Sequence, residues 1–344
     1  MNEDRFGVLR LEPWCLDTYP IQIWDHVKPQ IKHVYFQLIE IYFEYMYPYL
    51  ICLENHLMEK DMSIFASGFI FFIGGLCIIM HYSNWGDYIE AICWYNTLYL
   101  LFDFYIDSEH ISNTNKLMLI ELLRVTLKEE TQVWTLEEIS ELNDPVIYTL
   151  YETYWKLITK YPKTKAYLQH IFNVQKRSFL LSKEKKHIPK EELYTIALEK
   201  GGYTTMVFSA IVGEERKEIL DTIYNIGIIM QLLDDFMDMK KDNHLGIETY
   251  ATYHLLNHHL SDYWKEISER IDTIHPFFTL FKIIYSLLLL YISCCIISKE
   301  ELHSVILVFC SRHNIVYRNI NSTLEEDTFQ QYKKMKYNKK VLLV

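Results

Sequence analysis

Proline is absent from two long stretches of this chain, between Pro48 and Pro145 and between Pro189 and Pro276. Within them, apolar residues recur mostly at spacings of three and four, the period of an α-helix, and no segment keeps the strict alternation of a β-strand. Because proline disrupts the interior of a helix, such segments favour long helices. Only 10 of the 344 residues are glycine, which is few for a β or α/β protein. The sequence therefore predicts an all-α fold of roughly ten or eleven helices.

Several prolines mark predicted helix boundaries. Pro145 follows Asp144, a residue type that caps helix N-termini, so a helix is expected to begin there. Pro189 precedes two glutamates and marks a second helix start. Pro162 separates two helical patterns, and Pro276 opens the last long apolar segment.

No internal repeat, low-complexity linker or shift in composition divides the chain. We therefore expect one all-helical domain over residues 1–344, with an N-terminal segment at 1–30 and a basic tail at 328–344. The lysines of this tail are interpreted as a solvated end, or as a segment that closes over an anionic substrate or touches a membrane.

Charge and cysteine content exclude some classes of protein. The chain has 34 Lys and Arg against 45 Asp and Glu, a formal net charge of -11, so nucleic-acid binding is not expected. The seven cysteines lie mostly in apolar runs without a Cys-x-x-Cys pair, which is typical of a reducing compartment. The N-terminus lacks the apolar core of a signal peptide, and we predict a cytoplasmic protein.

Two apolar segments, residues 63–80 and 283–298, have the composition of membrane spans. Each is barely long enough to cross a bilayer, and neither has a basic flank that would orient it. We interpret both as buried core helices and expect no integral membrane insertion.

Carboxylates form a regular stripe near the middle of the second proline-free stretch. Asp234, Asp238 and Asp242 are spaced by four, so on a helix they lie on one face with about 6 Å between neighbours. Like charges at this spacing repel each other unless a cation is present, and hard oxygen ligands suit Mg²⁺. The alternative is a solvated acidic face with Lys240 and Lys241 as counter-charges.

A second carboxylate pair, Asp103 and Asp107, also has a spacing of four. It ends a predicted helix over residues 88–107 that is largely apolar and aromatic. Taken alone, the pair would mark the point where this helix reaches water. Together with the first stripe, it predicts two acid-bearing helices that face each other.

These motifs carry a resemblance to a known superfamily. The run from Gln231 to Asp238 reads Gln-x-x-Asp-Asp-x-x-Asp, residues 103–107 read Asp-x-x-x-Asp, and Gly246 and Thr249 follow the first of these runs. The chain resembles the class I terpenoid synthases and trans-prenyltransferases over roughly residues 60 to 320. Phe104 stands where chain-elongating members have a second aspartate, so the resemblance favours the cyclase branch.

The resemblance implies a single-domain helical bundle with a central active-site cavity. It implies Mg²⁺, three ions when substrate is bound, with Mn²⁺ able to substitute. Asp235 joins the catalytic set, and the implied metal ligands are Asp103, Asp107, Asp234, Asp238 and Asp242. Contacts to substrate are implied for Tyr99, Arg177, Lys200, Gly201, Phe208, Gln231 and Arg318.

The resemblance also predicts a helix broken near a glycine that faces the substrate. Gly201 and Gly202 match this break, and Lys200 beside them would meet a diphosphate. The alternative is an ordinary helix end with the glycine pair as its C-cap.

By resemblance, the predicted activity is that of a Mg²⁺-dependent terpene synthase acting on a linear prenyl diphosphate such as farnesyl or geranylgeranyl diphosphate. A cavity lined with aromatic rings would keep water from the carbocation, and 15% of the residues are aromatic. One alternative is a prenyl-chain-elongating transferase, although residues 1–100 lack the basic cluster that would hold its second diphosphate. Another is a non-catalytic helical subunit of the same fold. The resemblance also admits a homodimer.

Overall fold

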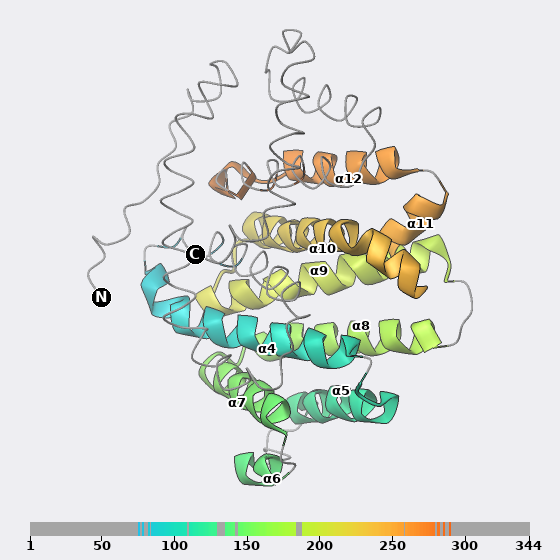
Figure 1. Ribbon diagram of the computed structural model, residues 1–344. Helices are drawn as coiled ribbons and strands as arrows, with labels where there is room; N and C mark the ends of the chain where they lie inside the picture. The colour runs from blue at the N-terminus through green and yellow to red at the C-terminus, as the bar shows by residue number, and fades with distance from the viewer. Residues whose placement is uncertain are drawn as a thin grey trace, which may run out of the picture. The chain divides into compact units, whose positions relative to one another are not determined.

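The computed structural model in Figure 1 describes residues 84–108, 110–128, 135–141, 144–183, 188–257 and 259–278, with single positions 75, 78, 82, 281, 282, 285 and 289. Contacts divide the chain into two units, Met1–Leu9 with Lys32–Ile296, and Arg10–Ile31 with Ile297–Val344. Every described residue belongs to the first unit, so a single domain over the whole chain stays a prediction. The N-terminal segment and the basic tail lie outside the described residues.

The described part of the chain is helical and contains no strand, which confirms the predicted all-α class. Its elements in chain order are η5 (Trp85–Tyr88), α4 (Ile89–Asp107), α5 (Asn113–Lys128), α6 (Leu136–Ser140), α7 (Pro145–Lys160), α8 (Thr164–Lys183), α9 (Lys190–Val212), α10 (Lys217–Leu245), α11 (Tyr250–Leu256), α12 (Leu260–Asp272) and η6 (Pro276–Phe278).

The helix boundaries expected at the prolines are confirmed. Asp144 caps α7, and its Oδ1 accepts the backbone N–H groups of Val146 and Ile147 at 2.9 and 3.2 Å. Helix α7 ends two residues before Pro162, and α9 begins directly after Pro189. These boundaries depend on local chemistry, which is why the sequence alone reveals them.

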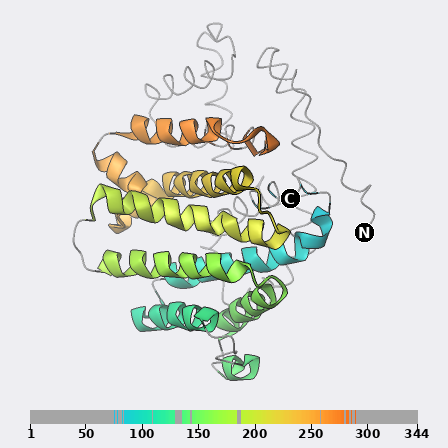
Figure 2. The same ribbon diagram turned by 180° about the vertical axis from the view of Figure 1, so that it is seen from behind.

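Helices α9 and α10 form an antiparallel hairpin and lie side by side in both views (Figures 1 and 2). Gly213, with φ of 70°, ends α9 in the left-handed conformation that favours glycine. Along the hairpin, Gly201 of α9 faces Gly227 of α10, and four residues later Thr205 donates its hydroxyl to the Ile223 carbonyl at 2.6 Å. Helix α8 packs on the other side of α9, and α4 packs against α7.

The prediction of a helix break or a helix end at Gly201 and Gly202 is wrong, since α9 runs continuously through both residues. The glycines serve the packing of the hairpin instead. A Cβ at Gly201 would meet the Gly227 carbonyl group and would lie 2.7 Å from the Gln231 Cβ, and a Cβ at Gly202 would meet the Tyr224 ring. Glycine is therefore needed for close approach and not for a change of direction.

Buried tyrosines fill much of the core, and several of their hydroxyls donate hydrogen bonds to backbone carbonyls. This pairing matters because an unpaired buried hydroxyl destabilises the fold by about 1 to 3 kcal/mol. Three of these bonds join different helices at 2.7 to 3.0 Å: Tyr95 to the Thr204 carbonyl, Tyr154 to that of Leu123 and Tyr263 to that of Leu232. The high tyrosine content thus has a structural use in the core, independent of any ligand.

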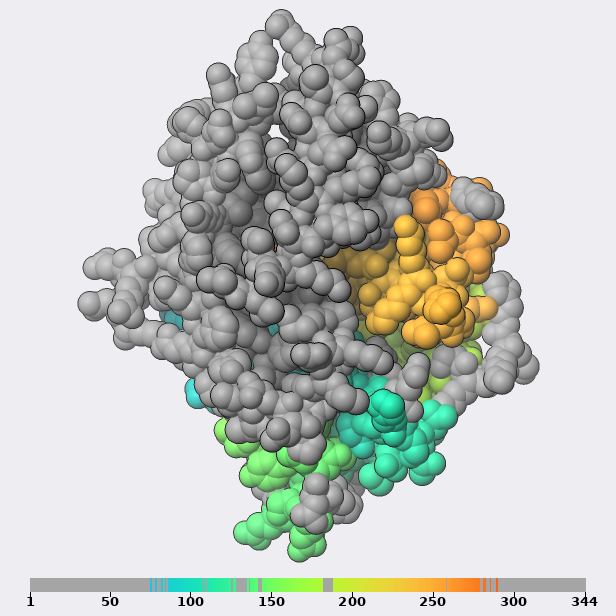
Figure 3. Space-filling model, in the orientation of Figure 1, coloured from blue at the N-terminus to red at the C-terminus, as the bar shows by residue number. Residues whose placement is uncertain are grey.

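None of the helices that the structure describes is long and apolar enough to cross a membrane. Residues 63–80 and 283–298 lie largely outside the described part of the chain. The four described positions within them are buried, at Gly75, Ile78, Tyr285 and Leu289. On the face shown in Figure 3, side chains of α5, α11 and α12 reach the surface.

Replacement of Gly201 tests the close approach of α9 and α10. We expect Gly201→Ala to lower the free energy of unfolding by about 1 to 3 kcal/mol, because the new Cβ forces the helix backbones apart. Alanine is the better helix former by about 1 kcal/mol, so a plain helical site would show a gain instead. Gly86→Ala is the control, since nothing lies within 4 Å of its Cβ position. Urea unfolding of both variants measures the two changes in the free energy of unfolding. A Gly201→Ala variant more stable than wild type would contradict close packing of α9 on α10 at this residue.

Glu214 lies between α9 and α10, and its interactions make the stability of the fold depend on acid pH. Its carboxylate accepts the Arg216 guanidinium at 2.6 Å and the Tyr82 hydroxyl at 2.7 Å, and only 4% of its side chain is exposed. Bonding to Arg216 is the main cause that lowers the pKa of Glu214 from 4.5 to about 2. Because the folded pKa is depressed, its stabilisation is present above pH 4.5 and is lost as the pH falls toward 2.

We therefore expect Glu214→Gln to lower the free energy of unfolding by about 1 to 3 kcal/mol at pH 7, with the difference from wild type shrinking toward pH 2. Glu215→Gln is the matched control, because Glu215 is exposed and, among the described residues, its carboxylate pairs only with Lys163. Denaturant unfolding at several pH values measures both. A difference that does not vary with pH would show that the Glu214 charge is unimportant.

Candidate active site

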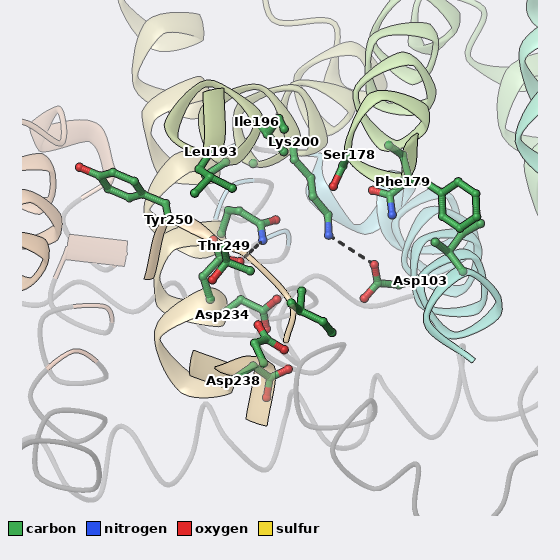
Figure 4. Close-up of a pocket in the computed structure, with 18 of the residues that line it drawn as sticks. Asp103, Ser178, Phe179, Leu193, Ile196, Lys200, Asp234, Asp238, Thr249 and Tyr250 are labelled. Carbon is green, nitrogen blue, oxygen red and sulfur yellow. Dashed lines mark hydrogen bonds and ion pairs between the residues drawn. The ribbon is translucent and has the colours of Figure 1, made fainter. Parts of the chain in front are cut away.

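A cavity of about 550 Å³ opens between helices α4, α5, α8, α9 and α10 and the start of α11. Figure 4 shows side chains from these helices converging on it. Its volume lies in the range of about 300 to 1,000 Å³ that is usual for small-molecule sites.

Helix α10 forms an acidic wall of this cavity. Asp234, Asp235, Asp238 and Asp242 all line it, as does Gln231, whose Nε2 donates to Asp235 Oδ1 at 2.8 Å. The predicted stripe with a spacing of four therefore lies on the cavity side of the helix. The Asp238 side chain is 39% exposed and pairs with Lys241 at 3.4 Å, so Lys241 is a counter-charge here, as the alternative expected.

Asp103 enters the same cavity from α4. Its Oδ1 lies 3.5 Å from the Nζ atom of Lys200, which comes from α9 and lies between Asp103 and the α10 acids in Figure 4. Asp107 is the last residue of α4, but its side chain lies outside the described residues. One acid of the first predicted motif and four of the second therefore border one space.

The electrostatics of the two walls are coupled. Burial, and after it the charges of Asp103 and Asp235, raise the pKa of Asp234 from 3.8 to about 8. Burial also raises the pKa of Asp235 to about 6, against the lowering effects of Lys200 and of the bond from Gln231. The charge of Asp103 acts on Asp234 only because α4 and α10 approach each other here.

Four of the predicted substrate contacts line the cavity: Tyr99, Lys200, Gly201 and Gln231. Tyr99 is close to both acid groups. Burial raises its pKa well above the usual value, Lys200 opposes the rise, and Asp103 and Asp234 add to it.

Of the other three predicted contacts, Arg177 and Phe208 are not among the described residues that line the cavity, and Arg318 stays a prediction. Arg177 forms ion pairs with Glu192 at 3.1 Å and Glu199 at 2.6 Å. Phe208 packs in the core, with its ring centroid 5.3 Å from that of Tyr95. Arg318 lies outside the described residues.

The cavity also has polar residues that the sequence analysis did not select. Gln175 and Ser178 of α8 and Lys116 of α5 line it. Gln175 is only 7% exposed, and its amide atoms are not among the buried polar atoms that lack a partner in the described part of the chain. Water or a ligand in the cavity can therefore reach this amide. Its spacing from Ser178 and Phe179, three and four residues, is the only sequence signal for this wall.

The donor chemistry of the acid wall fits a hard divalent cation. Its carboxylate oxygens are the ligands that Mg²⁺ prefers. Burial first, and then the neighbouring acids, raise the pKa of Asp234, and a cation would offset the repulsion among these acids. In the part of the chain that the structure describes, no three His, Cys, Asp or Glu side chains form a metal-binding group. A cation at this wall would therefore need further oxygen ligands, from the side chain of Asp107, from water or from a bound anion.

Comparison of the chain with protein-family models, with curated proteins and with solved structures found no match. The site is therefore interpreted from its own residues.

The raised pKa of Asp234 predicts a loss of stability with rising pH. A folded-state pKa above the unfolded value means that this group's contribution is fully present below about pH 4 and is lost as the pH rises toward 8. Asp234→Asn cannot ionise, so its stability should decline less over this range than that of wild type. Thermal unfolding between pH 4 and 8, with a chelator present, measures the two slopes.

Asp221→Asn is the control, since Asp221 lies exposed on the same helix. It should follow the wild-type slope. Parallel slopes for all three proteins would mean that Asp234 is not buried against other acids.

Proposed function

We propose that this protein is a class I terpenoid synthase that ionises a linear prenyl diphosphate, such as farnesyl or geranylgeranyl diphosphate, and releases diphosphate with a terpene hydrocarbon or alcohol. One observation carries the proposal: Asp103 of α4, Lys200 of α9 and Asp234 of α10 border the same cavity. This arrangement supports the resemblance noted from the two aspartate motifs, since two acid-bearing helices flank one space that a small molecule can fill.

The acids have the first role in this proposal. Asp103 and Asp107 would hold Mg²⁺ from α4, and Asp234, Asp238 and Asp242 would hold it from α10. When bound, Mg²⁺ supplies Lewis-acid neutralisation of the diphosphate leaving group. Asp235 is held by Gln231 at 2.8 Å, which orients the carboxylate next to Asp234.

Hydrogen-bond donors on the other walls would bind the diphosphate group. Lys200, Lys116 and Gln175 line the cavity and would donate hydrogen bonds to diphosphate oxygens. Gln175 replaces Arg177 as the α8 residue proposed to bind substrate, since Arg177 is engaged with two glutamates.

Apolar side chains would enclose the prenyl chain. Leu100, Phe179 and Met230 line the cavity together with Tyr99. They would exclude water from a carbocation, and an aromatic ring face stabilises positive charge. The charges of Asp103 and Asp234 act on the Tyr99 hydroxyl, so the Tyr99 ring would lie near the charge that develops on an ionised chain.

Incubation with prenyl diphosphates of each chain length and Mg²⁺ tests the function. A synthase should convert one allylic diphosphate alone into inorganic diphosphate and an extractable hydrocarbon or alcohol. Asp103→Asn and Asp234→Asn should each lower kcat by about two orders of magnitude or more, and the double variant should be little worse, because residues that act as a unit are not additive. Asp221→Asn should retain turnover.

The same assay separates the alternatives. Longer linear diphosphates, formed only when isopentenyl diphosphate is added, would indicate a chain-elongating transferase. Absence of diphosphate release from every substrate, in a folded protein, would favour a non-catalytic helical subunit. Full activity in excess EDTA would contradict the proposed use of Mg²⁺.

A further inference from the structure

Lys200 lies inside the acidic cavity, where a metal ion would be expected to bind. Its Nζ is 3.5 Å from Asp103 Oδ1, and its side chain is 21% exposed. Its charge also acts on Asp234 and Asp235 of the facing helix. One ammonium group therefore serves as counter-charge to both acid walls.

The hairpin holds this lysine in place. Lys200 directly precedes Gly201, the residue that brings α9 into backbone contact with α10 at Gly227. The Thr204 hydroxyl bonds to the Lys200 carbonyl at 2.6 Å, and the Thr205 hydroxyl bonds across to Ile223, also at 2.6 Å. The backbone of Lys200 is thus fixed, while its long side chain can change partner.

A divalent cation and the Lys200 ammonium cannot both stay beside Asp103 without strong repulsion. Two like charges a few ångströms apart in a partly buried site repel by several times the thermal energy. A metal ion that binds alone must displace Lys200 and leaves this charge without its carboxylate. A metal ion that arrives with a polyanion offers Lys200 a new partner.

We infer that Lys200 is an internal competitor of the metal, which makes binding of a divalent cation at Asp103 conditional on a polyanion that takes over the ammonium group. The inference rests on the metal part of the proposed function, but it concerns the order and coupling of binding and not the reaction. In the ligand-free protein Lys200 pairs with Asp103. In the loaded protein it pairs with anionic oxygens, and the metal takes the carboxylate.

Lys240 provides the control. It lies on α10 next to the acid wall, but it is exposed and is not among the residues that line the cavity. Solvent therefore screens its charge. Competition with a metal is assigned to Lys200, which lies inside the cavity beside Asp103.

Binding of Mn²⁺ by calorimetry, with and without inorganic diphosphate, tests the inference in wild type, Lys200→Gln, Lys200→Arg and Lys240→Gln. Lys200→Gln should bind Mn²⁺ alone about tenfold more tightly than wild type, since the competitor is gone. With diphosphate present it should bind Mn²⁺ about tenfold more weakly, since a charge-assisted contact is lost. Lys200→Arg keeps the charge and should resemble wild type in the first measurement. Lys240→Gln should change both affinities by less than about threefold.

The decisive result is that Lys200→Gln binds Mn²⁺ alone more tightly and binds Mn²⁺ with diphosphate more weakly. A lysine with a merely structural role would not change the two affinities in opposite directions. Unchanged or weaker binding of Mn²⁺ alone by folded Lys200→Gln would overturn the inference, as would equal behaviour of Lys200→Gln and Lys200→Arg. Normal terpenoid turnover with either result leaves the proposed function standing. Opposite shifts without turnover of any prenyl diphosphate would support the competition and reject the terpenoid reaction. No Mn²⁺ binding by any protein would overturn both.

Discussion

The contact between Gly201 and Gly227 determines how α9 and α10, which both line the cavity, meet. A Cβ on either residue would collide with the carbonyl group of the other, so the two helix backbones touch. Each glycine in a helix interior is unfavourable by about 1 kcal/mol relative to alanine, and the close packing of α9 on α10 must offset this. Neighbouring residues gain their positions from this contact: Lys200 precedes Gly201, and Gln231 and Asp234 follow Gly227 by one and two turns.

Close approach of the helices also brings several carboxylates together around the cavity, where their charges repel each other. Four acids of α10 and one of α4 border the same space, and the fold provides Lys200, Lys241 and a bond from Gln231 to Asp235 in return. This compensation is incomplete, because Asp234 still has a raised pKa. Proteins accept such local instability where a ligand relieves it. The grouping of these partly buried acids is therefore better explained by binding than by stability.

Features that depend on neighbouring residues along the chain can be predicted from the sequence. Features that depend on contacts between distant parts of the chain cannot. Asp144 and Pro189 mark helix starts because capping is local, and the spacing of Asp234 and Asp238 places them on one face in any helix. Gly201 was expected to break or end a helix, but glycine is also used where two backbones touch, and only the partner at Gly227 reveals this. Gln175 and Arg177 are two residues apart on α8 and so point about 160° apart. Which of them faces the cavity depends on how α8 is rotated in the fold.

The two sides of the cavity together restrict the ligand that would complement it. A free anion would be repelled by the α10 acids, and a free cation would compete with Lys200 and leave the Gln175 amide without an acceptor. An apolar molecule would leave both sides unsatisfied. A ligand that carries metal ions on one side, anionic oxygens on the other and an apolar chain beside Tyr99 and Met230 would satisfy every wall at once. A metal-bound prenyl diphosphate has these three parts, and this complementarity supports the terpenoid-synthase proposal more strongly than the acid motifs do alone.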